Sequence, residues 1–419
     1  MSSTQQSAQH RPAMKTAAEA LSLILNKASA TDVTEMVATQ DALGRVLAVD
    51  LLSQVDVPPA DNTQMDGYAV RVADIPISGT TLKVAQRIPA GHVGVALEPG
   101  TAARIFTGAQ VPSGADAVIM QELCKLKDDQ VTILELPQKG QWIRLQGEDL
   151  KTGSLALKQG TLLRPQELGV AASAGYAQLP VYRKIKVATF FTGDELTMPG
   201  QPLKPGAIYN SNRDTLLGCL RAMGCEASDL GIVPDTLEAT RTALRRAAAD
   251  HDLVITSGGV SVGEEDHLKP AVTAEGHLDM WQIAIKPGKP LAFGTIRKSE
   301  GQGQGQGQTF FMGLPGNPVA SYVTFLLFAR PFIARLQGRT SVTAPAMMMR
   351  ADFNWPKPDR RNEFLRVRLN EQGGLELFSN QGSGVLTSAS WADGLVDNPP
   401  NQVINVGDMV KYLPFSGML

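Results

Sequence analysis

The stretch of this sequence that is best suited to chemistry runs from Asp252 to Asp266 and reads DLVITSGGVSVGEED. An apolar run, residues 253–255, leads into a loop of Ser and Gly, and three acids follow at once. Such a loop at the end of a strand can point unpaired backbone N–H groups at an anion. Carboxylates beside it can hold a divalent cation against the same anion. The stretch therefore predicts a site for a phosphate group and a metal ion.

The same loop also matches a different catalytic motif. Residues 259–263, GVSVG, fit the G-x-S-x-G turn of serine hydrolases, which needs an acid and then a distant histidine later in the chain. Only His267 and His277 follow, and both lie too near in sequence. The predicted strand also ends several residues early, before Ser257. Chain order therefore disfavours a hydrolase, and the plainer alternative is a tight turn that needs glycine for positive φ.

Two acidic segments follow other predicted strands. Asp194 and Glu195 lie in FFTGDEL, at the edge where a parallel sheet binds ligands, although a solvated turn would read the same way. Asp235 begins Asp-Thr-Leu-Glu, which predicts a capping box for the next helix. A cap and a role in a site are both compatible with an acid at that junction.

Two proline-rich turns supply groups that could bind anions. Lys286-Pro-Gly-Lys289-Pro holds two ammonium groups close together, and exposed like charges favour an oxyanion between them. Residues 315–318, PGNP, place Asn317 as the cap and Pro318 as the first residue of a helix whose N–H groups face a strand end. An exposed basic turn and a capped turn are the plainer interpretations.

Composition limits the class of protein. The chain has 419 residues, enough for two to four domains, with 43% hydrophobic and 19% charged residues. A net charge of −2 gives no general reason to expect nucleic acid or an anionic membrane as a partner. The three cysteines lack C-x-x-C spacing, which argues against disulfides and a thiolate zinc site. The polar N-terminus has no signal-peptide core, and the longest apolar run, residues 323–329, is too short to span a bilayer, so we expect a cytoplasmic protein.

The predicted elements indicate a multidomain α/β plus β protein. Thr16-Ala-Ala-Glu19 predicts a capping box, and short β-rich runs over residues 46–179 predict one or two all-β modules. From residue 181, strands alternate with helices, which indicates a doubly wound, mostly parallel α/β domain. The strands are predicted at residues 185–191, 226–233, 253–256, 280–285 and 309–312, and the helices at 212–223, 236–249 and 318–336.

The rest of the chain completes this division. The tract GQGQGQGQ is expected to be an extended hairpin loop, and residues 342–419 predict a small β-barrel or sandwich. The expected domains are residues 14–180, a β-rich N-terminal region of two subdomains, residues 181–338, the α/β domain, and residues 339–419, the barrel.

Nine motifs in a fixed order resemble one family. They are MDGYAV, RIFTGA, GED, TGDEL, GIVPD, TSGGVSVGEED, KPGKP, GLPGNP and RRNEF, and the resemblance covers the chain from about residue 16 to residue 413. They resemble the molybdopterin molybdenumtransferases, the bacterial MoeA family, to which the E domains of gephyrin and of its plant counterpart are related.

The resemblance implies molybdenum cofactor biosynthesis. The family inserts molybdate into adenylylated molybdopterin with release of AMP, using a divalent cation such as Mg²⁺. Its members are homodimers, in which the partner subunit's N-terminal region, the place of Asp66 and Thr107 here, completes the cleft. For this protein we expect neither nucleic acid nor a membrane as a partner. The adenylyltransferase of the same pathway is a candidate partner. Adenylylation of molybdopterin is also an alternative function for this protein. A second alternative is a non-catalytic scaffold.

The resemblance also implies the site residues. Asp266 is expected to bind the metal, and Lys286, Lys289, Arg361 and Ser383 to hold molybdate by charge and hydrogen bonds. The full catalytic set is Asp66, Thr107, Asp149, Asp194, Glu195, Asp235, Asp266, Lys286, Lys289, Arg361 and Ser383. The residues expected to bind the molybdopterin substrate are Ser257, Gly258, Gly259, Ser261, Gly263, Pro315, Asn317 and Pro318.

Overall fold

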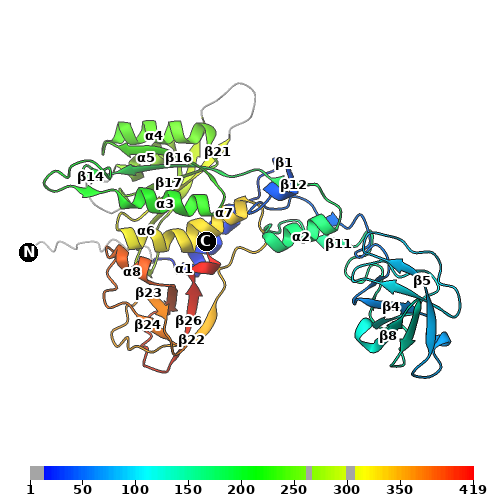
Figure 1. The fold of residues 1–419 in the computed structure, drawn as a ribbon. Helices are drawn as coiled ribbons and strands as arrows, with labels where there is room; N and C mark the ends of the chain where they lie inside the picture. The colour runs from blue at the N-terminus through cyan, green and yellow to red at the C-terminus, as the bar shows by residue number, and fades with distance from the viewer. Residues whose placement is uncertain (1–13, 261–266, 299–306) are drawn as a thin grey trace, which may run out of the picture. The chain divides into compact units, whose positions relative to one another are not determined.

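The structure, a computed structural model, describes residues 14–260, 267–298 and 307–419 (Figure 1). It divides into two compact units. The first comprises the described residues of Met1–Glu35, Gly44–Val46 and Tyr182–Leu419, and the second comprises Met36–Leu43 and Leu47–Val181. The expected domain limits at residues 180 and 338 remain predictions.

The first unit is built around a six-stranded sheet of order β16-β13-β17-β21-β20-β18. The first four strands are parallel, and β20 and β18 are antiparallel to their neighbours. This arrangement confirms the predicted, mostly parallel α/β domain. Its strands are β13 (Lys186–Thr192), β16 (Glu226–Val233), β17 (Leu253–Ser257), β18 (Gly276–Gln282), β20 (Pro290–Arg297) and β21 (Gln308–Leu314).

Helices cover both faces of this sheet. Because side chains alternate along a strand, Val187 and Phe191 of β13 pack on one face and Ala188 and Phe190 on the other. Figure 1 shows α4 and α5 above the sheet and α3 and α6 below it. The helical segments are α1 (Ala17–Lys27), α3 (Ser211–Ala222), α4 (Leu237–Asp250), α5 (Leu268–Glu275), α6 (Pro318–Thr324), the π-helical turn η4 (Phe325–Ala329) and α7 (Arg330–Leu336).

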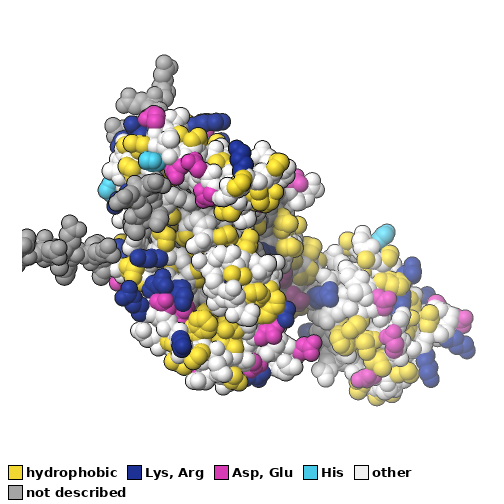
Figure 2. Space-filling view, turned by 90° about the vertical axis from the view of Figure 1, so that its left-hand side faces the viewer, with side chains coloured by type: hydrophobic (Ala, Val, Ile, Leu, Met, Phe, Trp, Pro, Cys, Tyr) yellow, Lys and Arg dark blue, Asp and Glu magenta, His cyan; other side chains and the backbone are white. Residues whose placement is uncertain are grey.

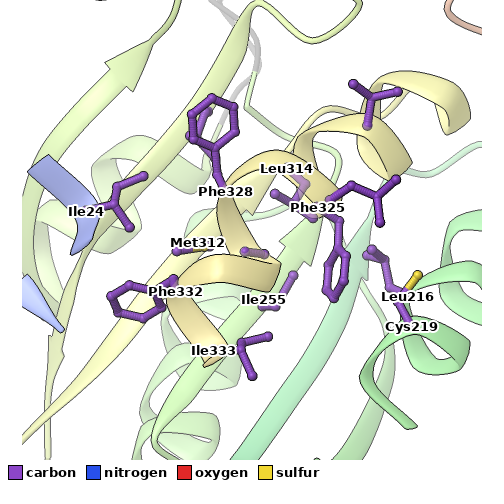
Figure 3. Packing of buried hydrophobic residues seen from close by; sticks show 14 of the residues in the cluster. Ile24, Leu216, Cys219, Ile255, Met312, Leu314, Phe325, Phe328, Phe332 and Ile333 are labelled. Atoms are coloured by element: carbon purple, nitrogen blue, oxygen red, sulfur yellow. The ribbon is translucent and has the colours of Figure 1, made fainter. Parts of the chain in front are cut away.

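The main core lies beneath the continuous helix formed by α6, η4 and α7. Phe325, Phe328 and Phe332 of this helix are buried in one cluster with Ile255 and Met312 of the sheet (Figure 3). The ring of Phe332 makes edge-to-face contacts with Phe293 and Phe310, with centroids 5.4 and 5.0 Å away. The core of the first unit therefore depends on aromatic packing from one helix.

This helix is also the one segment in the described ranges that is long and apolar enough to cross a membrane. The window Pro318–Leu336 has a mean hydropathy of 1.4, and 83% of it is buried inside the protein. As predicted, the helix continues past Arg330 to Leu336, because Pro331 falls in the first turn of α7, where a missing N–H is tolerated. Its burial is typical of the core helix of a globular domain.

The N-terminal helix belongs to the same core. The predicted capping box is present: the Thr16 hydroxyl accepts from the Glu19 N–H at 3.2 Å, and the Glu19 carboxylate accepts from the Thr16 N–H at 2.8 Å. Ala20 and Ile24 are fully buried against the helices of the first unit. The chain therefore contributes α1 to the first unit before it enters the second.

The C-terminal part of the first unit is the predicted small barrel. Its strands run in the order β19-β23-β25-β26-β22, and β24 pairs with β23. A bridge between Ala351 and Leu375 joins the end of β22 to β24, which closes the sheet. The elements are β19 (Ile285–Lys286), β22 (Met347–Arg350), β23 (Asn362–Leu369), β24 (Leu375–Leu377), α8 (Leu386–Trp391), β25 (Gly394–Asn398), β26 (Met409–Pro414) and η5 (Phe415–Gly417).

The expected strand over residues 280–285 is wrong in one respect. β18 ends at Gln282, and Ile285 and Lys286 form β19, which pairs with β23 of the barrel. Between them, Ala284 donates its N–H to the Lys15 carbonyl at 2.8 Å. The chain therefore leaves the central sheet and joins the barrel sheet before it returns as β20.

The Gly-Gln tract falls between paired strands. Arg297 of β20 pairs with Gln308 of β21 in an antiparallel ladder, as the predicted hairpin requires. Residues 299–306, which include most of that tract, lie outside the described residues.

The second unit contains a six-stranded sheet of order β7-β4-β6-β5-β9-β8 and several two-stranded pairs. It also contains α2, so the expectation of all-β modules was incomplete. Arg164-Pro165 with Glu167 is a helix-start pattern that could have revealed α2. Its elements, with β1 and β12 at its limits, are β1 (Thr34–Ala38), η1 (Thr39–Asp41), β2 (Leu51–Leu52), β3 (Asn62–Thr63), β4 (Gly67–Val70), η2 (Val72–Asp74), β5 (Thr81–Ile88), β6 (Thr101–Ile105), β7 (Ala117–Met120), η3 (Gln121–Leu123), β8 (Cys124–Lys127), β9 (Gln130–Ile133), β10 (Ile143–Arg144), β11 (Leu155–Leu157), α2 (Pro165–Ser173) and β12 (Gln178–Tyr182).

Phe332→Ala tests the aromatic core. Because the side chain is fully buried between two other rings, its loss should destabilise the first unit by about 3–5 kcal/mol. Urea denaturation followed by circular dichroism measures the change as a lower midpoint. The control Leu237→Ala, at a side chain that is 40% exposed, should stay within about 0.5 kcal/mol of the wild type. Equal midpoints for the two variants would contradict the described packing.

Candidate active site

A cavity of about 760 Å³ lies at the carboxyl edge of the central sheet. Loops after β13, β16, β17 and β21, the turn before β20 and two loops of the barrel line it. On the face seen in Figure 2, Lys and Arg side chains gather on the left with acidic side chains among them. The sequence-predicted residues among its lining are Glu195, Asp235, Ser257, Gly258, Gly259, Lys286, Lys289, Pro315, Asn317, Pro318, Arg361 and Ser383.

The strand order sets the order of these loops across the cavity. From one side of the sheet to the other come the loops after β16, β13, β17 and β21, and then the start of β20. β20 is antiparallel, so its first residues lie at the same edge as the carboxyl ends of the parallel strands. At roughly 4.8 Å per strand, the lysine turn lies about 15 Å along the sheet from the loop after β13.

The Ser/Gly loop needs glycine at its first turn. Gly258 has φ +100°, and a Cβ there would lie 2.6 Å from the Thr192 carbonyl oxygen. The strand is one residue longer than expected and includes Ser257, which is 2% exposed. The Ser257 hydroxyl donates to the Pro315 carbonyl at 2.8 Å, so it joins two loops of the cavity wall. Ser261, Gly263 and Asp266 lie outside the described residues.

Sequence reasoning missed Asn212, which strengthens the same junction. Its Nδ2 donates to Ser257 Oγ at 2.8 Å and to the Gly316 carbonyl at 2.7 Å. Its place in the first turn of α3 suggested only the start of a helix. The run Asn210-Ser-Asn212 at a strand-to-helix junction is the signal that could have identified it.

Three buried polar atoms of this wall have no hydrogen-bond partner among the described residues. They are Thr192 Oγ1, Asn210 Nδ2 and Asn212 Oδ1. Their residues are 5%, 2% and 9% exposed, and all three line the cavity. Because an unsatisfied buried polar group costs about 1–3 kcal/mol, this wall is built for polar contacts that the described chain does not supply.

The turn at residues 315–318 offers fewer donors than its motif suggests. Asn317 is the N-cap of α6 and Pro318 follows it, as predicted, but the Asn317 side chain makes no capping hydrogen bond. Pro318 has no N–H, and Val319 donates its N–H to the Ser383 carbonyl at 2.9 Å. The turn therefore fastens the barrel loop at Ser383 to the helix.

The two lysines of the 286–290 turn differ. Lys286 Nζ lies 3.1 Å from Glu363 Oε1 and 3.6 Å from Asp359 Oδ2, so it is already paired. Lys289 is exposed, and no carboxylate of the described ranges lies within ion-pair distance of it. The prediction of two unpaired ammonium groups is therefore wrong for Lys286, because acids of the barrel compensate its charge.

Arg361 is held in a fixed orientation by Asp359. Its Nε and Nη2 donate to the two carboxylate oxygens at 3.0 and 2.9 Å. This pairing holds the pKa of the Asp359 carboxyl far below its usual range. A bidentate pair of this kind orients the guanidinium plane before any ligand binds.

A buried arginine supports the loop that carries Ser383. Arg366 is 1% exposed, and it donates to the Gly382 carbonyl at 3.2 Å and to Ser388 Oγ at 3.1 Å. Its own N–H donates to Gln381 Oε1 at 2.9 Å. Burial lowers the pKa of Arg366 to about 10. Sequence reasoning missed it because it looks like an ordinary strand residue.

The acids near the cavity differ in whether they line it. Glu195 and Asp235 line it, whereas Asp194 is exposed and is not among the lining residues. The capping prediction for Asp235 is wrong: Thr236 caps α4, and its hydroxyl accepts from the Ala239 N–H at 3.3 Å. The helix begins one residue later than expected, which leaves Asp235 half-buried at the cavity.

The second unit contains the other predicted site residues. Asp66 Oδ1 accepts from the Thr107 N–H at 2.8 Å and from its hydroxyl at 2.7 Å. These two hydrogen bonds, of which the backbone one has the larger effect, lower the pKa of the Asp66 carboxyl. Asp149 lies in an exposed loop, and its N–H donates to the Val57 carbonyl at 3.0 Å. The motifs MDGYAV and RIFTGA thus meet through Asp66 and Thr107.

Comparison with known families defines the class of this protein. Residues 15–175 match the "MoeA N-terminal region (domain I and II)", and residues 349–415 match the "MoeA C-terminal region (domain IV)". Residues 188–335 match a "Probable molybdopterin binding domain". The chain therefore has the three regions of a MoeA-type protein, with a probable molybdopterin binding domain between the other two.

Similar proteins identify the family to which this chain belongs. A molybdopterin molybdenumtransferase of Haemophilus influenzae is 40% identical over 414 residues, which covers 97% of this chain and 100% of that protein. One of Bacillus subtilis is 35% identical, covering 87% of this chain and 86% of that protein. The crystal structure of the molybdopterin biosynthesis moeA protein from Pyrococcus horikoshii is similar with a TM-score of 0.82 and 29% identity, covering 96% of this chain and all of that one. This chain belongs to the molybdopterin molybdenumtransferase family.

The variants Lys286→Met and Lys289→Met should distinguish a lysine that stabilises the fold from one that contributes only surface charge. Removing Lys286 leaves Glu363, which is 1% exposed, without its nearest cation and should destabilise the protein by about 1–3 kcal/mol. Lys289 is exposed, so its variant should stay within about 0.5 kcal/mol of the wild type. Thermal denaturation compares them, and equal losses would refute the assigned pairing.

Proposed function

We propose that this protein inserts molybdate into adenylylated molybdopterin and releases AMP, which completes the molybdenum cofactor in the cytoplasm. One observation carries the proposal. A single cavity combines a glycine loop at the carboxyl edge of a molybdopterin-binding α/β domain with cations of the lysine turn and the barrel. Membership of the molybdenumtransferase family supports the same reaction.

The pyrophosphate link of the substrate fits the middle of the cavity. There the loops after β17 and β21 approach closely: a Cβ on Gly316 would lie 3.6 Å from Gly258 Cα. Small side chains at this point let a ligand reach backbone groups. Asn212 and Ser257 hold the two loops together, so the phosphates would meet a wall that is already ordered.

Molybdate fits the cationic end of the cavity. Lys289 supplies an exposed charge, Arg361 supplies a guanidinium already oriented by Asp359, and Ser383 supplies a hydroxyl. Lys286 adds a charge that is partly compensated by Glu363. These groups would bind the tetrahedral oxyanion by charge and hydrogen bonds, and would orient it toward the pterin.

We also propose a magnesium ion beside the phosphates of the substrate. Among the described residues, no group of three His, Cys, Asp or Glu side chains could hold a metal. A divalent ion on a phosphate substrate needs only one or two protein carboxylates. We assign this role to Asp266, with Glu195 and Asp235 on the cavity wall, and the ion would neutralise charge on the pyrophosphate.

Two alternatives are less well supported. The adenylyltransferase reaction would need only the α/β domain, whereas barrel residues Arg361, Gln381 and Ser383 line this cavity. A non-catalytic scaffold would not need acids and cations to converge on one cavity. Production of the adenylylated substrate from ATP and molybdopterin, without AMP release from it, would favour the adenylyltransferase.

We further propose a homodimer in which the partner subunit's Asp66 and Thr107 complete the cleft. Their mutual hydrogen bonds fix the carboxylate in one orientation, as a residue that meets a ligand requires. The other pathway enzymes, above all the adenylyltransferase, are proposed as transient partners, and neither nucleic acid nor membrane is needed.

The direct test mixes purified protein with adenylylated molybdopterin, Mg²⁺ and molybdate and follows AMP. We expect molybdate-dependent release that stops when EDTA removes the metal and that falls at least about a hundredfold in Asp266→Asn. No AMP above a protein-free control would refute the function. Release that survives Asp266→Asn would remove only the metal assignment.

Lys289→Met should raise the KM for molybdate by about tenfold or more, because a charged hydrogen-bond partner contributes about 1.5–3 kcal/mol. Steady-state kinetics with varied molybdate measure the effect. The KM for adenylylated molybdopterin should change far less. An unchanged KM for molybdate would contradict the oxyanion role of Lys289.

A mixed dimer tests the shared cleft. Asp66→Ala and Lys289→Met homodimers should each be weakly active, since every cleft lacks one group. After the two proteins are unfolded and refolded together, heterodimers would contain one intact cleft and activity should recover to roughly a quarter of the wild type by random pairing. If the refolded mixture recovers no activity, the proposal of a composite cleft is refuted.

A further inference from the structure

The Asp66–Thr107 pair of the second unit joins two separate segments of the chain. The carboxylate and the hydroxyl that meet there lie 41 residues apart in sequence, so other contacts must hold the two segments together. We propose that Arg104 is a positioning residue, which holds both segments so that the Asp66 carboxylate keeps one orientation. This inference rests on the proposed function, since Asp66 is assigned there to the cleft.

Arg104 lies on the middle one of three neighbouring strands. It is part of β6, and it pairs with Tyr68 of β4 on one side and with Arg87 of β5 on the other. Residues that lie directly opposite each other in a sheet present their side chains on the same face. The Arg104 guanidinium carbon accordingly lies 5.2 Å from the centre of the Tyr68 ring. From this position Arg104 can reach both β4, which follows Asp66, and the end of β6, which precedes Thr107.

On the Asp66 side, Arg104 bonds two groups that fix the Asp66 backbone. Its Nη1 donates to the Gly67 carbonyl at 3.3 Å, and its Nη2 donates to Gln121 Oε1. Gln121 in turn donates its backbone N–H to the Asp66 carbonyl at 3.0 Å. A Cβ on Gly67 would lie 1.8 Å from the Ile119 carbonyl oxygen, so the backbone after Asp66 lies tight against β7. The guanidinium therefore fixes the backbone that carries the Asp66 side chain.

On the Thr107 side, Arg104 holds the aromatic ring that comes directly before Thr107. Its guanidinium carbon lies 4.7 Å from the centre of the Phe106 ring, and that of Arg87 lies 4.5 Å from the same ring. A cation over an aromatic ring is attracted to it, so both arginines restrain Phe106. Thr107 then donates its N–H and its hydroxyl to Asp66 Oδ1. Arg104 is thus in contact with both segments that build the pair.

Arg104 is better suited to orient protein groups than to bind a ligand directly. Its Nη1 and Nη2 both donate to groups of the same unit, and two aromatic rings lie against its guanidinium. The Thr107 backbone N–H, the Thr107 hydroxyl and the charge of Arg104, in that order of effect, lower the pKa of Asp66. An ionised carboxylate that is already oriented meets a ligand without reorganisation. Arg104 therefore contributes to the site through Asp66.

A double-mutant cycle tests whether Arg104 acts through Asp66. AMP release is measured for the wild type, Asp66→Ala, Arg104→Met and the double variant. We expect Arg104→Met to lower kcat/KM by about tenfold or more, because hydrogen bonds from a charged donor are among the stronger ones. In the Asp66→Ala background the same change should cost less than about twofold. An arginine that only stabilises the fold would lower the activity of both proteins equally, and that result would overturn the proposal.

Hydrogen exchange of the Thr107 amide tests the positioning without turnover. In the wild type this N–H is bonded to Asp66 Oδ1, so it exchanges only when the pair opens. NMR of the full-length protein labelled at threonine should show exchange about tenfold faster or more in Arg104→Met. Arg104→Lys keeps the charge but loses the planar fork, so it should show a smaller increase and serves if Arg104→Met does not fold. Unchanged exchange in the folded variants would overturn the proposal.

Arg87→Met is the matched control. Arg87 is exposed and stacks on the same Phe106 ring, but the bonds to Gly67 and Gln121 come from Arg104. Its variant should keep both the Thr107 exchange rate and kcat/KM within about twofold of the wild type. Equal effects of Arg87→Met and Arg104→Met would assign the effect to charge beside the ring and overturn the role of Arg104.

Failure of the proposed function appears separately from failure of this inference. If the wild type releases no AMP, the function is refuted, whereas exchange of the Thr107 amide in Arg104→Met still decides whether Arg104 positions the pair. If the wild type releases AMP and that exchange is unchanged, the function stands and the positioning role is overturned.

Discussion

The pairing of β19 with β23 is the constraint on which the cavity depends. Ile285 and Lys286 pair with Asn362 and Glu363 of the barrel, and four residues later Pro290 begins β20 in the central sheet. One short turn is therefore held by two sheets at once. Gly288 within it has φ +112°, and a Cβ there would lie 2.4 Å from Thr324 Oγ1, so the turn also lies close against α6. This attachment brings the barrel loops to the carboxyl edge of the α/β domain, where its own loops end.

The charges of the cavity are largely oriented before a ligand arrives. Asp359 holds Arg361 by two hydrogen bonds, and Glu363 holds Lys286 while also accepting from Trp355 Nε1 at 2.7 Å. Such pairing reduces the net positive potential, but it removes the need to reorganise side chains during the reaction. Groups that are already fixed in place stabilise developing charge without further reorganisation. For this reason, positioning supplies much of the catalysis in group transfer.

The sequence was informative where the determining contacts are local. The capping box at Thr16 and Glu19, the strand-helix alternation and the hairpin around the Gly-Gln tract depend on neighbours in the chain, and the structure has them. The full set of site residues was predicted only from the resemblance of the ordered motifs to a known family. The pairing of Lys286 could not be read, because Glu363 lies 77 residues away. Likewise, Arg366 supports the Ser383 loop through contacts that only the closed barrel creates.

The unsatisfied groups at the cavity belong to the same design. Thr192 Oγ1, Asn210 Nδ2 and Asn212 Oδ1 are buried without partners among the described residues, although most buried polar atoms in proteins are bonded. All three lie on the wall formed after β13, where the sequence has polar residues instead of the apolar ones that would pack more stably. A fold selected only for stability would bond or replace them, since each costs about 1–3 kcal/mol. Their retention at one wall of the cavity is explained if that wall exchanges stability for recognition of a polar ligand.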